Sequence, residues 1–273
     1  MLWGVVLLCT GSVALADVRL DRMLMGERED LKAPRFAFTE KTAYVAPKDA
    51  VEASNELGNE DWMTARDVDS SSTDKKASWA SADLIPFETG CGMAPCPPEP
   101  PPGPADWHAT VLWDHGGKQP EVVVWHIARV VAAKAQKAAL TKGTTPAAIA
   151  KKIDGAEELV KAFEASIGDP KALAKTVSDR KDVVLYGNEA KERTVGGAKV
   201  KAKLTAWNLG FTVRDGIQAG LTSSKTVGWV AANVNAKSPK KPKDKPVPYR
   251  LLFIYEKKGT EWKLVNAHFS FVD

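Results

Sequence analysis

The sequence has no long apolar run beyond its first 16 residues, and this excludes a membrane span in the rest of the chain. Residues 1–16 are uncharged and apolar but too short to span a bilayer, and they end in Ala14-Leu15-Ala16, a small-x-small cleavage pattern. We therefore expect a signal peptide and a periplasmic or secreted protein. No Lys or Arg precedes the apolar run, which a start codon placed too far downstream would explain. Lipid attachment at Cys9 is disfavoured because Leu8 precedes it.

Cysteine is also scarce, with three in 273 residues. Removing the signal peptide leaves Cys91 and Cys96, which lie in a loop rich in Gly and Pro. In an exported chain this pair is most simply a local disulfide, with free thiols as the alternative. We expect no metal site, because the pair would need further ligands and only His108 and His115 lie near it.

The basic residues do not alternate with aromatic residues, so the sequence does not indicate nucleic-acid binding. Residues 17–104 hold 10 basic and 17 acidic residues, whereas the rest of the chain holds 28 basic and 17 acidic ones. This contrast predicts two units with different surfaces. Residues 237–245 contain five Lys, and we interpret them as a solvated loop, with an anionic partner as the alternative.

Alternating apolar and polar residues predict antiparallel strands over much of the chain. After weaker strand patterns at 35–45 and 62–68, we expect strands at 77–86, 107–113, 121–131, 182–186, 209–222, 226–234, 248–255 and 262–271, with a bulge at Arg214-Asp215-Gly216 and a polar turn at 70–76. Helices are expected at 132–140, from Thr145-Pro146, at 155–167, from Asp169-Pro170 and at 198–207.

The two halves of the chain resemble each other. Residues 75–82 are similar to residues 224–232, and Trp79 corresponds to Trp229 after a one-residue slip. A Pro-rich loop and a strand pair follow each segment, and the last strand carries His126 or His268, each nine positions after a turn glycine. We interpret the halves as two copies of one sheet unit, the first irregular.

The second half also resembles a known family. It carries a Tyr-Gly turn at Tyr186-Gly187, then Glu192, then Gly196-Gly197 before a helix, and it closes on Trp262, Leu264, Val265, His268, Phe269 and Ser270. This order is similar to the SnoaL-like branch of the nuclear-transport-factor-2-like superfamily, also called ketosteroid-isomerase-like. The resemblance covers residues 155–273 and extends only weakly to residues 35–131.

The resemblance implies an α+β fold: a cone-shaped, curved antiparallel sheet that wraps helices, in two tandem copies. The expected organisation is a signal peptide at 1–16, an irregular first SnoaL-like copy with its Pro-rich loop at 17–131, a helical connector at 132–154 and a SnoaL-like domain at 155–273. The family includes isomerases, cyclases, dehydratases, transport adaptors and oligomerisation modules, so fold alone does not assign a function.

Several side chains are candidates for a pocket in the second cone. His268 and Asn266 share strand parity with Trp262 and Leu264, which predicts that they face the cone interior. His268 there would bind ligand or transfer protons, and the alternative is that both are hydrogen-bonded core residues. His126 offers the same two interpretations.

The other pocket candidates are Tyr186, Glu192, Trp207, Arg214 and Trp229. Glu192 is either a pocket carboxylate or a solvent-facing loop residue, and Arg214 either enters the pocket or belongs to a bulge. The aromatic residues line a pocket or fill the core. No residue is assigned a catalytic role. We expect no cofactor, because Gly187 and Gly196-Gly197 lack the strand–loop–helix context of a phosphate cradle.

These observations support three functions. The first is an exported SnoaL-like protein that binds a small apolar molecule or a protein partner without catalysis. The second is an acid–base enzyme of isomerase, cyclase or dehydratase type that uses the second cone. The third is an oligomerisation scaffold, which predicts an exposed apolar sheet face. We expect the two copies to pair within the chain, or the chain to form a homodimer.

Overall fold

The computed structural model describes residues 36–38, 43–44, 63–74, 76–86, 107–118, 121–142, 148–189, 191–238, 240 and 243–271. The expected signal peptide at 1–16 and the cysteines Cys91 and Cys96 lie outside this part of the chain. Within it, the strands form a six-stranded and a seven-stranded sheet, so the α+β class with antiparallel meanders is confirmed.

The six-stranded sheet has the order β2-β1-β6-β5-β4-β3. Its centre is an antiparallel meander, and its strands are β1 (Phe36–Phe38), β2 (Ala43–Tyr44), β3 (Met63–Asp74), β4 (Ala77–Pro86), β5 (Trp107–Asp114) and β6 (Glu121–Arg129). The expected polar turn at 70–76 is wrong over most of its length. β3 runs on to Asp74, because Ser70, Ser71 and Ser72 pair with β4 despite their turn-forming residue type.

The seven-stranded sheet has the order β7-β10-β11-β12-β13-β8-β9. Its strands are β7 (Lys152–Asp154), β8 (Val184–Tyr186), β9 (Arg193–Val195), β10 (Gly210–Leu221), β11 (Val227–Lys237), β12 (Val247–Lys258) and β13 (Glu261–Phe271). The expected bulge in β10 is confirmed, since its register with β11 shifts between Val213 and Ile217. The strand face that each residue occupies therefore changes at this point.

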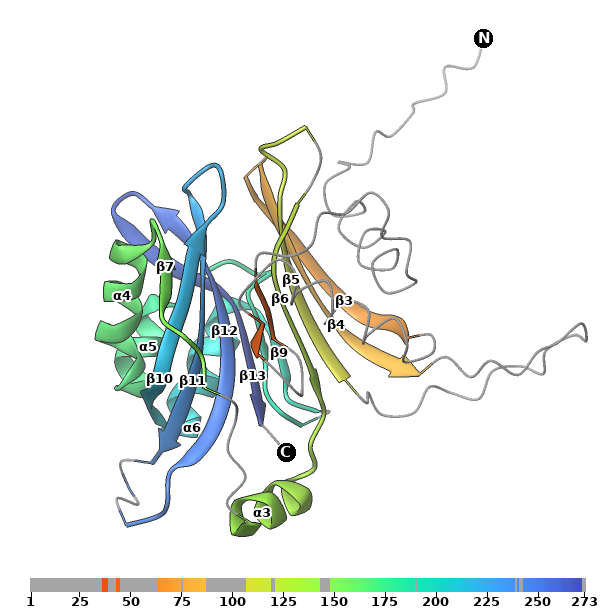
Figure 1. Cartoon of the computed structure of the whole chain (residues 1–273), viewed down its shortest axis with the longest axis vertical. Coiled ribbons are helices and arrows are strands. Elements are labelled where there is room, and N and C mark those ends of the chain that lie inside the picture. Colours follow the sequence, from red (N-terminus) through yellow and green to blue (C-terminus); the bar gives the residue numbers. More distant parts are fainter. Residues whose placement is uncertain are drawn as a thin grey trace, which may run out of the picture.

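Three helices cover one face of the seven-stranded sheet: α4 (Glu157–Ile167), α5 (Pro170–Thr176) and α6 (Gly197–Trp207) (Figure 1). Asp169 caps α5 by accepting a hydrogen bond from the Lys171 amide, and Pro170 occupies the first turn, as the sequence predicts. Helix α3 (Ala133–Lys142) follows β6 and lies apart from these three. None of the helices in the described residues is long and apolar enough to cross a membrane.

The helix expected from Thr145-Pro146 is absent from residue 148 onward, where the chain is extended and forms β7. β7 pairs in parallel with β10. The residues just before β7 are hydrogen-bonded to side chains of β10 at and next to its bulge. The Asp215 carboxylate accepts from the Ile149 amide, and Gln218 donates to the Ala150 carbonyl. Pairing with a sheet edge thus overrides the local helical pattern. β7 belongs to the second sheet, so this unit begins before residue 155.

The two sheets have the same strand order over six strands. β1 and β8 each pair in parallel with the last meander strand, and each is followed by an antiparallel partner, β2 or β9. In this correspondence His126, which pairs with Phe38, is equivalent to His268, which pairs with Tyr186. The last strands also share a bulge, at Val123 in β6 and Val265 in β13. The histidines matched in the sequence therefore occupy matching places.

The six-stranded sheet packs against the face of the seven-stranded sheet that the helices leave uncovered (Figure 1). An apolar cluster joins the sheets and includes Trp79, Leu112 and Val124 from one side and Trp229 and Ile254 from the other. All five are at most 5% exposed, so the contact excludes water. In the described residues, the helices α4, α5 and α6, the seven-stranded sheet and the six-stranded sheet form three successive layers.

Candidate functional site

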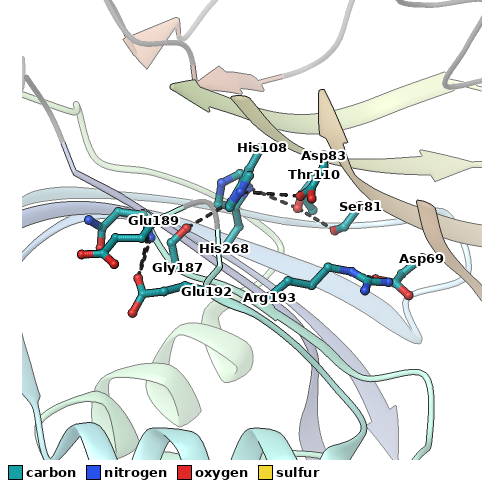
Figure 2. A network of polar contacts seen from close by, with 11 residues as sticks. Asp69, Ser81, Asp83, His108, Thr110, Gly187, Glu189, Glu192, Arg193 and His268 are labelled. Carbon is teal, nitrogen blue, oxygen red and sulfur yellow. Dashed lines mark hydrogen bonds and ion pairs between the residues drawn. The ribbon is translucent and has the colours of Figure 1, made fainter. Parts of the chain in front are cut away.

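A polar group of side chains lies buried at the centre of the contact between the sheets (Figure 2). We call it the inter-sheet polar cluster, and it contains Ser81, Asp83, His108, Thr110, His126, Asn266, His268 and Ser270. Each of these residues is at most 5% exposed. Three of the four histidines of the chain therefore meet in one water-excluded layer. Because burying polar groups is costly, their partners decide whether this arrangement stabilises the fold.

The cluster is centred on a stack of two histidines. The rings of His126 and His268 lie 4.0 Å apart, centroid to centroid, with an interplanar angle of 18°. Each ring is hydrogen-bonded to a hydroxyl of the opposite sheet: His126 Nε2 to Ser270 Oγ at 2.8 Å, and His268 Nδ1 to Thr110 Oγ1 at 3.2 Å. The stack and both bonds thus cross the contact between the sheets.

A chain of hydrogen bonds extends from this stack to Asn266. The Asn266 amide donates to Ser81 Oγ at 2.7 Å, and Ser81 is bonded to Thr110 at 2.7 Å, which in turn reaches His268. Asn266 and His268 are alternate residues of β13, and Ser81 and Thr110 are paired across β4 and β5. Register alone therefore brings these four side chains to one face of each sheet.

The third histidine, His108, attaches the six-stranded sheet to the turn after β8. Its Nδ1 donates to the Gly187 carbonyl at 3.2 Å, and its Nε2 lies 3.6 Å from Asp83 Oδ1. The ring also packs edge-on against Tyr186, with centroids 4.6 Å apart. Because a carbonyl only accepts, the Nδ1 of His108 carries a proton.

Burial keeps all three histidines neutral at neutral pH. Desolvation lowers the pKa of His108 to about 4, although its bond to the Gly187 carbonyl opposes the shift. The pKa of His126 is lowered by burial and then by the positive charge of Arg250 and by His108. The pKa of His268 is lowered by burial and then by the other two histidines. Neutral imidazoles can stack, whereas charged ones would repel.

A buried arginine lies beside the cluster on the same face of the seven-stranded sheet. Arg250 pairs with Ser270 across β12 and β13 and with Asn233 across β11, and it is 2% exposed. Burial lowers the pKa of Arg250 to about 10, while the charge of Asp215 raises it. Asn233 donates to both oxygens of Asp215, at 3.3 and 3.1 Å, so this row connects the cluster to the β10 bulge.

The helix-covered face of the same sheet has a different character. Its cluster of described side chains is apolar apart from the hydroxyl of Tyr255, and Leu159, Phe163, Leu204, Phe253 and Leu264 are at its centre. Among the described residues, the buried Asp, Glu and His side chains are Asp83, His108, Asp114, His126 and His268, and none of them lies on this face. The buried acids and histidines of the described residues are therefore confined to the opposite face of this sheet.

The structure brings four of the seven candidate pocket residues to one face. Tyr186, Trp229, Asn266 and His268 all lie on the face that contacts the six-stranded sheet. The expectation that Asn266 and His268 face the cone interior is therefore wrong. The bulge at Val265 reverses the side-chain alternation, so that Trp262 and Leu264 face the helices while Asn266 and His268 face the opposite way.

The other three candidates lie elsewhere. Glu192 closes the β8–β9 turn, since its carboxylate accepts from the amides of Asn188 and Glu189, and burial raises its pKa. Trp207 ends α6 and packs edge-on against Phe269 on the helix-covered side. Arg214 is exposed at the β10 bulge. The seven residues thus do not form one pocket.

Sequence reasoning missed most of the six-stranded side of the cluster. Ser81, Asp83, His108 and Thr110 were not candidates, although His126 had been matched to His268. A signal was available, because Ser81 and Asp83 share strand parity with Trp79, whose counterpart is Trp229. Polar residues at the parity of a buried Trp indicate a polar patch on a buried face.

The three histidines do not form a metal site, and no group of three or more His, Cys, Asp or Glu among the described residues could hold a metal ion. Stacked rings direct their nitrogens outward in parallel planes instead of toward one point. The bonded nitrogens of His126, His268 and His108 face Ser270, Thr110 and the Gly187 carbonyl, respectively.

No family model matches the chain, and no curated protein matches it. The solved structures that resemble it include ketosteroid-isomerase-like and NTF2-like proteins, as the sequence motifs predict. One is a candidate ketosteroid isomerase from Parabacteroides distasonis, at 15% identity, covering 42% of this chain and 86% of that one, with a TM-score of 0.34.

Two further similar structures belong to the NTF2-like group. A protein of unknown function from Pseudomonas putida is 11% identical, covers 42% of this chain and 82% of its own, and has a TM-score of 0.34. A candidate dehydratase from Streptomyces avermitilis is 18% identical and has a TM-score of 0.35, and the similarity covers 43% of this chain and 95% of the dehydratase. Each similarity covers less than half of this chain and concerns the fold alone.

Proposed function

We propose that this chain is an exported, non-catalytic binding protein made of two copies of a SnoaL-like unit that pair with each other, and that it acts by binding a protein partner. The observation that carries the proposal is the location of the buried titratable groups. The histidines and Asp83 face each other between the sheets, at most 5% exposed, where a substrate does not reach them. The helix-covered face of the seven-stranded sheet carries an apolar cluster.

The same observations weigh against the other functions expected from the sequence. An acid–base enzyme using the second cone would need an acid or histidine on the helix-covered face, whereas the buried acids and histidines of the described residues lie elsewhere. An oligomerisation scaffold would need an exposed apolar sheet face, whereas the free face of the seven-stranded sheet is covered by the six-stranded sheet.

One end of the molecule is suited to an acidic protein partner. Helix α3 has exposed Lys134 and Lys137 and no acidic residue. Lys237 at the end of β11 is exposed, and the β11–β12 loop has exposed Lys240, Lys243 and Lys245 beside a single described acidic residue, Asp244. The two segments are linked, because Gln136 of α3 donates to the Tyr249 hydroxyl just after the loop, and both lie at the same end in Figure 1. We call this region the basic end. A field of one sign attracts a partner of the opposite sign.

Native mass spectrometry of protein purified from its source tests the absence of a small ligand. We expect the mass of the polypeptide alone, and a retained apolar molecule would contradict the proposal. The same material tests export. The mature N-terminus is expected at Asp17, and an intact Cys91–Cys96 disulfide would lower the unreduced mass by about 2 Da.

Chemical cross-linking in the source cells tests the partner. A K240E/K243E/K245E variant should lose the partner that the wild type captures. The matched control is K161E/K171E/K175E, which makes the same charge change at exposed positions of α4 and α5. Equal loss in both variants would show that overall charge, not the basic end, decides the binding.

A further inference from the structure

We propose that the inter-sheet polar cluster is a proton-binding site, and that protonation of the His126–His268 stack at mildly acidic pH separates the two sheets while each sheet keeps its strands. The proposal is independent of the proposed function. It concerns what holds the sheets together, whatever partner the protein binds.

The geometry of the stack is the first reason. At a centroid distance of 4.0 Å, the rings of His126 and His268 cannot both carry a positive charge without strong repulsion, because no water lies between them to screen it. One ring belongs to each sheet, so the repulsion acts directly across the contact. Its relief requires the sheets to move apart.

The charges around the stack are the second reason. Two neighbours disfavour a positive charge on His126: Arg250 of β12 and His108 of β5. A positive charge on His268 is disfavoured in the same way by His126 and His108. Tyr186 of β8 meets His268 with its neutral ring at 5.9 Å. Asp83 of β4 lies beside His108, the histidine outside the stack, and Asp215 of β10 faces Arg250. Protonation of the stack therefore places positive charge beside the Arg250 guanidinium, which already acts on His126.

The nature of the contact is the third reason. The central hydrogen bonds run between side chains of different sheets: Asn266 to Ser81, His268 to Thr110 and His126 to Ser270. The backbone bonds of each sheet stay within that sheet. Separating the sheets thus breaks side-chain contacts and the bond from the Val131 amide to the Asn188 carbonyl, and it leaves every strand pairing intact. Water can then replace the lost hydrogen-bond partners.

The direction of the effect follows from linkage. The histidines are neutral in the closed form and regain an ordinary pKa near 6.5 when hydrated. The closed form is fully favoured above pH about 6.5 and loses stability as the pH falls below it. Each histidine changes the closed-to-open ratio by about tenfold per pH unit, so the two stacked histidines change it by about a hundredfold.

Small-angle X-ray scattering and far-UV circular dichroism of the full chain between pH 7.5 and 4.5 test the proposal. We expect a reversible increase in the radius of gyration below pH 6.5 with no loss of strand signal. The variant H126Q/H268Q should stay closed to about one pH unit lower. H115Q is the matched control, because His115 lies in the β5–β6 turn, bonded to Ser78, and should open like the wild type.

Three outcomes would overturn the proposal. They are an unchanged radius down to pH 4.5, an opening pH that H126Q/H268Q does not shift, and a loss of strand signal in step with the expansion, which would mean unfolding. If the double variant does not fold, NMR titration of the histidine ring protons in the wild-type protein still tests the proposal. Rings of His126 and His268 that titrate near 6.5 while the protein stays compact would refute the mechanism.

Discussion

The imidazole rings of His126 and His268 stack 4.0 Å apart across the contact between two sheets, at equivalent positions of the two strand meanders. The stack lies in a layer of hydrogen-bonded polar side chains, surrounded by an apolar cluster that contains Trp79 and Trp229. A polar centre with an apolar surround fixes the relative position of the sheets, because a shifted alignment would break the bonds from Asn266 to Ser81, His268 to Thr110 and His126 to Ser270.

The free energy of unfolding should decrease as the pH is lowered. Each of the three buried histidines has a lowered pKa in the folded protein. The free energy of unfolding is therefore highest above pH 6.5, the pKa of histidine in the unfolded chain, and it declines below that pH. The decline is about 1.4 kcal/mol per pH unit for each histidine, and for His108 it continues to pH about 4. Urea titrations at pH 7.5, 6.5 and 5.5 measure it. H108Q should reduce the slope, and an unchanged slope in this variant would contradict the assignment of His108.

The buried hydroxyl of Tyr255 should destabilise the folded protein. Among the described residues it has no hydrogen-bond partner although it is 1% exposed, and burial raises its pKa. Tyr255→Phe should therefore stabilise the protein by about 1 kcal/mol. The matched control is Tyr249→Phe, which removes the bond from Gln136 and should destabilise by about 1 kcal/mol. Thermal unfolding of both variants measures the difference, and a destabilised Y255F would indicate a partner for the hydroxyl.

Gly216 should be required for the attachment of β7. A Cβ at this position would lie 2.0 Å from the Ile149 carbonyl oxygen and 2.7 Å from the backbone of Ala150. Gly216→Ala should displace residues 149–154 and cost about 2 kcal/mol, with faster hydrogen exchange confined to that segment. Gly168→Ala is the control, because its nearest neighbour is a carbonyl oxygen 4.0 Å away. Equal exchange at 149–154 in both variants would rule out this close contact.

The edge of the contact between the sheets should be fastened by an ion pair. Arg193 of β9 donates from Nε and Nη2 to the Asp69 carboxylate of β3, at 2.8 and 2.7 Å, with the side chains 30% and 17% exposed. A double-mutant cycle with R193Q and D69N should give a coupling of about 1 kcal/mol that decreases in salt. The more exposed Lys263–Glu261 pair should give less than half of this. Zero coupling would mean that the contact between Arg193 and Asp69 does not stabilise the protein.

Local patterns predicted most of the secondary structure. Alternation gave the bounds of β4, and Asp169-Pro170 gave the start of α5, because these signals depend on neighbouring residues only. β7 was not predictable in this way, since it forms by pairing with β10. Its own residues, Lys152 to Asp154, carry no strand pattern. Long-range pairing decides such short edge strands.

The site was harder to predict than the fold. His268 and Asn266 were correctly singled out as unusual, but parity assigned them to the wrong face. One extra residue at Val265 reverses the alternation, and a bulge leaves no clear mark in a run of apolar residues. The partners Ser81 and Thr110 belong to another sheet, and no local pattern indicates which two faces will meet.

The hydrogen bonds of the two stacked histidines are not mirror images of each other. In a homodimer, equivalent residues at the symmetry axis would have identical partners. Here His126 bonds Ser270, whose counterpart is Ala128, and His268 bonds Thr110, whose counterpart is Leu252. Joining both units in one chain removes the constraint that every substitution occurs twice. The contact therefore has an asymmetric set of hydrogen bonds that a twofold-symmetric pair of identical chains could not form at its axis.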